Sequence, residues 1–449
     1  MQADKQIPEI QNVVADVLAL AKQKGATQAE ASMSKIQGIA VGTRMLEVET
    51  IEFNNDGGLG ICVFVGKRKG SASTADLSKE ALELTVEKAV QIAKHTSEDP
   101  YSGLADAELM VKTPRDLNLY FPQPLDTEQG IALAKEAEES ALSYDEKVKQ
   151  SDGCAFNANI GCRVYGNTHG VNIGYPSSRY SYSCMMIAEQ TTPEKTEKDM
   201  QRDYAYTVAR EFRDLRSPAL IGTEASRNAV NRLGGRKLST MSTPVLFHKE
   251  IASSLYGHLI SGISGGALYR QSSFLMDSLN TQILPDWFSI LERPHLPKGL
   301  ASSAFDSEGV ETQDIDIITN GVLNHYLLAS YSARRLGMQT NGHAGGIHNW
   351  LVQDTGEDET TLLRKMNTGL YVTELMGQGV NTVTGDYSRG AAGFWVENGV
   401  IQYPVHEITI ASNLKDMFQN IVAVGREVDA NSSIRSGAIL IESMQIAGN

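Results

Sequence analysis

LEVETIEFNNDGGLGICVFVG, residues 46–66, is the stretch that decides the fold class of the N-terminal region. Its two ends, 46–53 and 60–66, are rich in β-branched and aromatic residues, which favours β-strands. Between them, the Asn-Asn-Asp-Gly-Gly run at 54–58 has the composition of a tight turn. The stretch therefore predicts an antiparallel hairpin whose turn lies at residues 54–58.

Amphipathic helices are predicted on both sides of this hairpin. Apolar residues recur at helical spacing over 10–21, after Pro8, and again over 82–93. Strands joined by a hairpin give an antiparallel sheet, and helices pack on one face of such a sheet, so the pattern indicates an α+β unit. A cluster of prolines between residues 100 and 124 then indicates a linker.

A second α+β region follows the linker. It contains a predicted helix at 127–142, short strands over 153–189 and a polar segment at 191–199 that we expect to be an exposed loop. In the C-terminal half, Asn320-Gly321 and Asn398-Gly399 each separate two strand-like segments. Asn-Gly at such a position is typical of a type I′ hairpin turn.

The chain is too long for a single hydrophobic core, so several domains are expected. We predict an α+β protein with an N-terminal α+β domain (1–120), a middle α+β domain (121–240) and a sheet-dominated C-terminal domain (241–449). The sheets are expected to be antiparallel or mixed, with helices packed against them.

Composition excludes several classes of partner. The formal charge of −14 and the pI of about 5.2 argue against nucleic acid, which is bound by clustered Lys and Arg. No secretory signal and no apolar run of membrane-spanning length is visible, so we expect a soluble, cytoplasmic chain that does not bind membranes. The four cysteines lack the spacing of a metal site, so we predict buried thiols.

The segment PVLFHKEIASSLYGHL, residues 244–259, looks like the zinc helix of a metalloprotease. Such a helix places two His one turn apart with a Glu beside them. Here His248 and His258 are ten residues apart, which corresponds to roughly 15 Å along the axis and about 80° around it. One zinc ion cannot bind both imidazoles at that separation, and Glu250 does not complete a site. We favour an amphipathic core helix and keep only Glu250 and His258 as weak catalytic candidates.

Two glycine-rich segments carry the remaining candidates. His343 and His348 flank a glycine-rich turn, and together with His406 they could form a three-histidine metal site. We favour the alternative, in which these histidines bond the backbone or line a peptide groove.

The second segment spans 377–393 and contains five glycines. It either turns a sheet corner or lets another backbone approach closely. We assign its centre to a peptide groove or a subunit contact: Gly385, Asp386, Tyr387, Ser388, Arg389 and Gly390.

Five segments of the chain, taken in order, match one known family: 52–64, 66–78, 284–310, 330–350 and 373–418. One stretch within them, GDYSRGAAGFWVENG, is too long to match by chance. On these segments the chain resembles the TldD/PmbA metalloprotease family, and specifically its PmbA (TldE) branch.

The resemblance implies a cytoplasmic heterodimer. In this family a TldD-type subunit binds zinc through HExxxH and a distant Cys, and it pairs with a PmbA/TldE-type subunit to cleave small unfolded proteins or peptide precursors. The helix at 244–259 lacks that motif, and Ser436 stands roughly where the Cys ligand is expected. We therefore expect no cofactor in this chain, zinc in the partner, and a homodimer when the chain is alone.

Three functional hypotheses follow. The first is a non-metallated subunit that shapes the groove of a zinc protease. The second is an independent metal-dependent hydrolase that uses His343, His348 and His406. The third is a gyrase-linked regulatory protein, which the acidic charge disfavours. The missing zinc motif favours the first.

Overall fold

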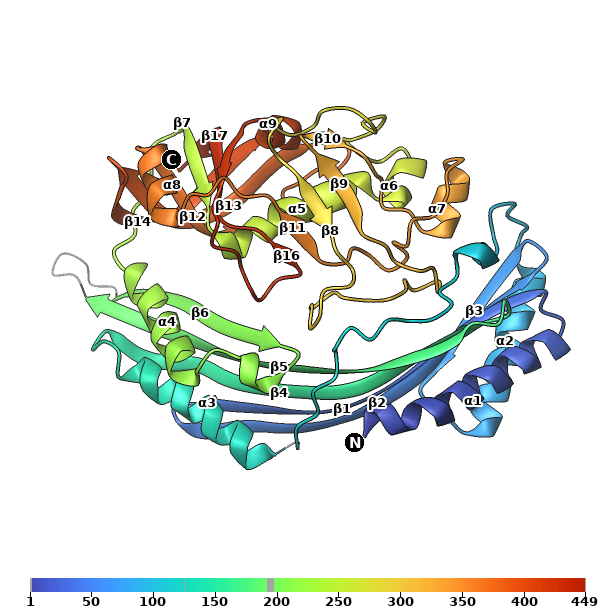
Figure 1. Ribbon diagram of the computed structural model, residues 1–449. Coiled ribbons are helices and arrows are strands. Elements are labelled where there is room, and N and C mark those ends of the chain that lie inside the picture. Colours follow the sequence, from blue (N-terminus) through green and yellow to red (C-terminus); the bar gives the residue numbers. More distant parts are fainter. Residues whose placement is uncertain (1, 125, 192–197, 449) are drawn as a thin grey trace.

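A computed structural model describes residues 2–124, 126–191 and 198–448. Figure 1 shows a long curved sheet whose outer face carries four helices and whose concave face holds the C-terminal part of the chain. This arrangement confirms the α+β class and the sheet-rich C-terminal region. Most of the predicted loop at 191–199 lies outside the described residues. No helix in the described parts is long and apolar enough to cross a membrane.

The curved sheet is antiparallel throughout and has the strand order β3-β2-β1-β4-β5-β6. It crosses the predicted domain boundary at residue 120, because β1 pairs with both β2 and β4. Its strands are β1 (Gln28–Arg44), β2 (Glu47–Val65), β3 (Arg68–Thr74), β4 (Val148–Asn167), β5 (Asn172–Thr191) and β6 (Lys198–Ala209).

The predicted turn at 54–58 is wrong. These residues lie inside β2, where Asn54 pairs with Gly38 and Gly58 pairs with Ser34. The hairpin turns instead at Met45 and Leu46, which have φ of 51° and 64°. Pairing along the whole length of β1 outweighs the local turn preference of the Asn/Gly run, since strand formation depends strongly on tertiary context.

The actual turn is held by a buried carboxylate. Glu138, 0% exposed, accepts hydrogen bonds from the backbone N–H groups of Met45 (2.7 Å) and Leu46 (2.9 Å). Bonds to a charged acceptor are the stronger kind, and they offset the strain of two left-handed residues. Glu138 lies 92 residues from Leu46 along the chain, so no local sequence pattern reveals this turn.

Four helices cover the outer face in two pairs (Figure 1). They confirm the helices predicted at 10–21, 82–93 and 127–142, although the first helix begins before Pro8 and contains it. Ser78 and Asp126 cap the second and third helices with their side chains. The helices are α1 (Ala3–Gln23), α2 (Lys79–His95), α3 (Thr127–Leu142) and α4 (Pro218–Asn231).

The C-terminal part contains two further sheets. One has the order β14-β13-β12-β7-β17-β15, in which β7 and β12 are parallel. The other has the order β10-β9-β8-β11-β16. Both predicted Asn-Gly turns are confirmed, since all four residues have positive φ. The strands are β7 (Met241–Phe247), β8 (Ile290–Glu292), β9 (Ile315–Thr319), β10 (Val322–Leu323), β11 (Trp350–Val352), β12 (Gly369–Met376), β13 (Asp386–Glu397), β14 (Val400–Asn413), β15 (Ile421–Val424), β16 (Ile434–Arg435) and β17 (Ile439–Ala447).

The helix that follows β7 joins these two sheets. Its buried residues belong to one apolar cluster that also contains residues of both sheets. This helix is α5 (Lys249–Ile263), and the other helices are α6 (Gly265–Tyr269), α7 (Ser330–Arg335), α8 (Glu359–Met366) and α9 (Leu414–Gln419), with 3-10 turns η1 (Ala107–Leu109) and η2 (Phe212–Asp214).

Hydrogen bonds between distant residues attach the C-terminal part to the curved sheet. Arg334 donates to the carbonyl oxygens of Tyr101 (3.2 Å) and Gly103 (3.1 Å). The Tyr165 hydroxyl donates to the carbonyl oxygen of Glu308 (2.7 Å). These contacts attach the C-terminal part to β4 and to the linker.

Candidate functional site

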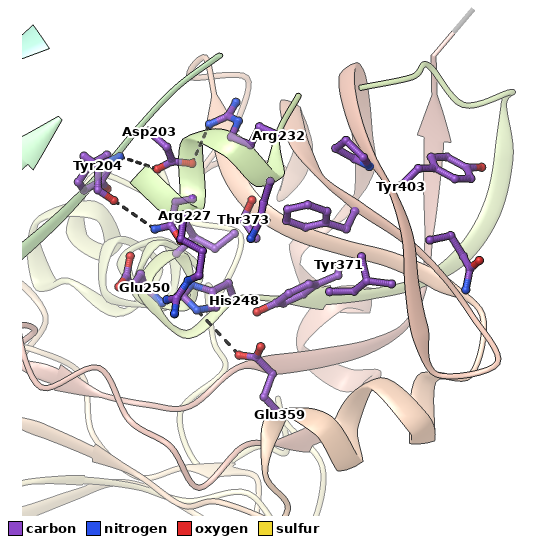
Figure 2. Close-up of a pocket in the computed structure, with 17 residues that line it drawn as sticks. Asp203, Tyr204, Arg227, Arg232, His248, Glu250, Glu359, Tyr371, Thr373 and Tyr403 are labelled. Atoms are coloured by element: carbon purple, nitrogen blue, oxygen red, sulfur yellow. Dashed lines mark hydrogen bonds and ion pairs between the residues drawn. The ribbon is translucent and has the colours of Figure 1, made fainter. Parts of the chain in front are cut away.

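A cleft of about 550 Å³ lies where the curved sheet meets the C-terminal part. Polar side chains from six elements line it (Figure 2). Its labelled lining residues are Asp203 and Tyr204 of β6, Arg227 and Arg232 of α4 and its C-terminal end, His248 and Glu250 at the start of α5, Glu359 of α8, Tyr371 and Thr373 of β12, and Tyr403 of β14.

A second cavity, of about 390 Å³, continues the first along α5. The two share Asp203, Tyr204, Arg232, Glu250, Ile251 and Thr373. The second adds residues further along α5 and β13, namely Ser253, Ser254 and Arg389. We call the two cavities together the α5 groove.

His248 caps the N-terminus of α5, where its Nδ1 accepts a hydrogen bond from the backbone N–H of Glu250 (3.4 Å). Its Nε2 lies 3.8 Å from Oε2 of Glu359 (Figure 2). Burial, together with the charge of Lys249, lowers the pKa of His248 to about 4. The imidazole is therefore neutral at neutral pH, and because Nδ1 accepts a bond, its proton lies on Nε2, toward Glu359.

Glu250 is the unpaired acid of the groove. Its carboxylate has no ion pair or hydrogen bond with any residue in the described parts of the chain. Burial raises its pKa to about 7, and the nearby carboxylates of Asp429 and Glu224 act in the same direction. A carboxyl group that titrates near neutral pH inside a cleft is a candidate for proton transfer or for binding a cation.

Two further carboxyl groups of the groove are better satisfied. Burial raises the pKa of Asp203, although hydrogen bonds from the Tyr204 N–H (2.7 Å) and Arg232 (3.2 Å) oppose the effect. Burial also raises the pKa of Glu359, against a hydrogen bond from Tyr371. Arg232 additionally pairs with Glu374, so it fixes the wall between β6 and β12.

The groove does not fit a catalytic zinc ion. One turn after His248, α5 presents Ala252, which is 0% exposed, and Ser253, and neither is a usual zinc ligand. Within residues 2–124, 126–191 and 198–448, no group of three or more His, Cys, Asp or Glu side chains is placed to hold a metal ion. What this chain brings to the groove is therefore its acids, its arginines and one neutral imidazole.

Sequence comparison assigns the chain to a family. Three models, described as domain 1, the central domain and the C-terminal domain of PmbA/TldA metallopeptidases, match residues 29–93, 120–233 and 240–448. The chain is also 51% identical over 447 residues to the metalloprotease PmbA of Escherichia coli O157:H7, which covers 100% of this chain and 98% of that protein. The chain belongs to the PmbA/TldA metallopeptidase family. The predicted resemblance is thereby confirmed.

Solved structures of relatives share the whole architecture. A Bacteroides thetaiotaomicron protein named as a candidate modulator of DNA gyrase superposes with a TM-score of 0.92 at 26% identity, covering 98% of this chain and 99% of that one. TldE from Thermococcus kodakarensis superposes with a TM-score of 0.84, covering 97% of this chain and 100% of that one. Because its identity is 17%, this second likeness shows the fold alone.

His343 and His348, assigned to a peptide groove or a subunit contact, lie inside the C-terminal core. They are 6% and 7% exposed. Nε2 of His343 forms an ion pair with Oε1 of Glu292 (2.7 Å), and the backbone N–H of His348 donates to Oε2 of the same carboxylate (3.1 Å). The indole N–H of Trp350 also donates to Oε2 (2.7 Å). Nε2 of His348 also bonds the carbonyl oxygen of Gly342 (3.0 Å), as in the alternative in which these histidines bond the backbone.

The second ring nitrogen of His343 also lies near an oxygen. Its Nδ1 lies 2.8 Å from Oδ1 of Asn341, and that oxygen also accepts a bond from the backbone N–H of Leu328 (2.9 Å). Both ring nitrogens of His343 therefore face oxygen atoms, since Oε1 of Glu292 lies on the other side.

The three-histidine metal site is wrong. His343 and His348 converge on Glu292, whereas His406 of β14 packs against Gly235, and its backbone N–H bonds the carbonyl oxygen of Arg236. Ser436, placed near a ligand position by resemblance, is 1% exposed and bonds the hydroxyl of Tyr256 (2.9 Å).

The segment 385–390 begins β13, and one of its residues faces the groove. Arg389 lines the second cavity. Asp386 is exposed and Tyr387 is 1% exposed, inside the apolar core. Gly385 has a φ of 86°, so the alternative of a glycine-built sheet corner applies at that position. Of the two weak catalytic candidates, Glu250 lines the groove and His258 packs edge-on against Tyr387 with a centroid distance of 5.9 Å.

The sequence reasoning missed most of the groove. Asp203, Arg232, Glu359 and Tyr371 come from four separate segments, and no spacing rule connects them. The segment 244–259 was predicted to be a single helix, but residues 244–247 belong to β7 and α5 begins at Lys249, so His248 caps the helix instead of lying inside it.

The raised pKa of Glu250 predicts a pH-dependent stability. Its folded pKa of about 7 lies above the ordinary value of 4.5, so between these pH values the folded chain binds more protons than the unfolded chain. The free energy of unfolding therefore falls as the pH rises through this window. The groups that face Glu250 are Asp429, Glu224, Asp203 and Lys249, and the three acids reinforce the trend.

Glu250→Gln should remove this penalty. We expect its Tm to exceed that of the unmodified chain by about 2–4 °C at pH 8 and to match it at pH 5. Thermal melts followed by circular dichroism at both pH values test this, with the exposed Glu146→Gln as the control. A Tm difference that is the same at both pH values would contradict the assignment.

Proposed function

We propose that this chain is the PmbA/TldE-type subunit of a cytoplasmic metalloprotease complex. It pairs with a zinc-bearing TldD-type subunit, which supplies the metal when bound, and the complex cleaves small unfolded proteins or peptide precursors. This chain binds no zinc of its own and contributes the α5 groove to the substrate path. Alone, it forms homodimers.

The donor set of the groove carries the proposal. His248 stands at the start of α5, where the resemblance puts the zinc helix of the TldD-type subunit, but Lys249, Ala252 and Ser253 follow it. A catalytic zinc needs three protein ligands and an open position. One neutral imidazole with Glu359 at 3.8 Å falls short of that set. The family membership supports a proteolytic role, which leaves substrate positioning to this chain.

Side chains, rather than a free strand edge, contact the substrate in this groove. The carbonyl oxygen of Tyr204, on the outer strand β6, already accepts a bond from Asn228 (3.3 Å). Further along this edge, Asn431 accepts from the Val208 N–H (3.1 Å) and donates to the Tyr206 carbonyl (3.3 Å). These side chains occupy the groups that an added peptide strand would need. Substrate therefore meets Glu250 and the polar walls directly.

Metal content and hydrolysis, measured together, test the proposed function. The purified chain should contain substoichiometric zinc by mass spectrometry and should not hydrolyse an unfolded peptide. Mixing it with the TldD-type subunit should give hydrolysis that exceeds that of either subunit alone, and a chelator should abolish it. Stoichiometric zinc in this chain, with unaided hydrolysis, would overturn the proposal.

The gyrase-linked alternative has no support in the groove. The name of one structural neighbour suggests it, but the charge of −14 disfavours direct contact with DNA.

A further inference from the structure

One cluster of buried polar side chains lies beyond the inner end of the α5 groove. Among the described residues, Nε2 of His258 has no hydrogen-bond partner, and the hydroxyl of Tyr387 has none beyond the Arg389 guanidinium beside it. The two rings meet edge-on at a centroid distance of 5.9 Å. A buried polar group without a partner typically destabilises a protein by about 1–3 kcal/mol, so under-satisfied groups side by side point to a ligand that completes the site.

A cation without a carboxylate partner stands next to this pair. Arg389 is two residues from Tyr387 on β13, so both side chains lie on the same face of the strand. Its Nε donates to the carbonyl oxygen of Gly377 (3.1 Å), and it forms no ion pair within the described residues. By contrast, Arg232, which lines the same cavity, is paired with both Asp203 and Glu374.

The helix α5 brings His258 to the same place. Ile251 and Ser254 line the second cavity. His258 follows Ser254 by four residues, so it lies one turn further along the same helix face. Arg389 is close enough for its charge to act on both groups. Burial lowers the pKa of His258 and the Arg389 charge lowers it further, while burial raises the pKa of Tyr387 to about 12 against the same charge.

We propose that Arg389, His258 and Tyr387 form a carboxylate-binding site at the inner end of the α5 groove. The guanidinium meets the carboxylate from the cavity, and the Tyr387 hydroxyl and His258 Nε2–H donate to its oxygens. All three groups can donate hydrogen bonds, and a carboxylate is acceptor-only, so the chemistry matches. The Tyr387 hydroxyl and Nε2 of His258 are covered in this conformation. The carboxylate therefore reaches them when the Arg389 side chain shifts, and a single hydrogen bond to the Gly377 carbonyl holds that side chain in place.

The carboxylate has two chemical sources in a peptide, its C-terminus and an acidic side chain. The inference rests on the proposed function in taking a peptide as the ligand, but it concerns binding to this chain alone. Glu250, unpaired and also on α5, lies nearer the outer cleft, since it lines both cavities whereas Arg389 lines the second. The groove thus offers a carboxylate site at its inner end and an unpaired acid at its outer cleft.

Binding of fluorescent peptides to the purified chain, without any catalytic subunit, tests the site. The probes are a short unstructured Ser/Ala peptide with a free C-terminal carboxylate, the same peptide as an amide, and the amide with one central Glu or Gln. We expect the preferred carboxylate to strengthen binding about tenfold or more. Tighter binding of the peptide acid than of its amide identifies the C-terminal carboxylate as the ligand. Tighter binding of the Glu amide than of the Gln amide identifies an acidic side chain as the ligand.

Substitutions of the three residues test whether they are the groups that recognise the carboxylate. Arg389→Ala should abolish the discrimination, and Tyr387→Phe and His258→Gln should each reduce it severalfold. Tyr387→Phe should not lower the Tm, because it removes a buried hydroxyl that meets only the Arg389 guanidinium among the described residues. A purely structural Tyr387 would leave binding unchanged. Arg364→Ala, an exposed arginine on α8, is the control.

Equal binding of all four peptides, no binding of any, or discrimination that survives Arg389→Ala would overturn the site. These outcomes are separate from the zinc and hydrolysis results, which decide the proposed function.

Discussion

Replacing Glu292 by alanine is expected to lower the free energy of unfolding of the C-terminal part by about 3–5 kcal/mol. Glu292 is 0% exposed and is the common partner of His343, the backbone of His348 and the indole of Trp350. Its removal leaves the buried His343 ring and two buried N–H donors without their common partner. Breaking a buried pair on one side is costly because the polar groups that remain are not compensated.

The carboxylate is ionised in this setting. Burial alone would raise the pKa of Glu292, but the bond and charge of His343 and the charge of His348 outweigh burial and lower it. Glu292→Gln keeps acceptor capacity but not the charge, so we expect an intermediate loss of stability. Three donors on one carboxylate thus hold the turn between His343 and β11.

Tryptophan fluorescence during urea unfolding measures this effect. All three tryptophans, Trp287, Trp350 and Trp395, lie in the C-terminal part, so their signal reports on that region. A matched control exists in Glu397, an exposed residue that also accepts an indole N–H, that of Trp395 (2.8 Å). Glu397→Ala should cost about 1 kcal/mol or less. Equal midpoints for Glu292→Ala and Glu397→Ala would rule out the buried pair as a major source of stability.

Local chemistry made some parts of the fold predictable. The Asn-Gly turns follow from residues that accept positive φ, and α2 and α3 follow from a polar cap and helical apolar spacing. The turn of the first hairpin could not be predicted in the same way. It depends on Glu138, which is distant in sequence from Met45 and Leu46. The Asn/Gly run at 54–58 carried the stronger local signal but lies within a paired strand.

The same distinction holds for the site. Glu250 and Arg389 could be singled out by residue type, and both line the α5 groove. The sequence left open whether His343 and His348 bond the backbone or line a groove, and Nε2 of His348 bonds the carbonyl oxygen of Gly342 (3.0 Å). Their common partner, Glu292, lies 56 residues before His348, and nothing in its own segment marks it as buried. A histidine pair near glycines has the same sequence pattern whether it faces solvent or a buried carboxylate. Only the pairing of β8 with β11 decides between them.

The groove depends on where α4 stands, because α4 carries Arg227 and Asn228 into its wall. That position is set by direct backbone contact with α3. A Cβ atom added at Gly222 would lie 1.9 Å from the carbonyl oxygen of Ala137, so no side chain fits between the two helices. Ser226, one turn later, adds a hydrogen bond to the carbonyl oxygen of Ala141 (2.8 Å).

Gly222→Ala should therefore destabilise the curved sheet and its helices by about 3 kcal/mol, because α4 must move away from α3. Gly257→Ala, the same substitution in α5, should have the opposite effect on the free energy of unfolding. A Cβ atom at Gly257 meets nothing within 4 Å, so alanine should stabilise that helix by about 0.5–1 kcal/mol. Far-UV circular dichroism melts of both variants test the contrast. If Gly222→Ala melts at the same temperature as the unmodified chain, α3 and α4 can move apart at no cost in stability. Close contact between α3 and α4 would then not be what positions the groove wall.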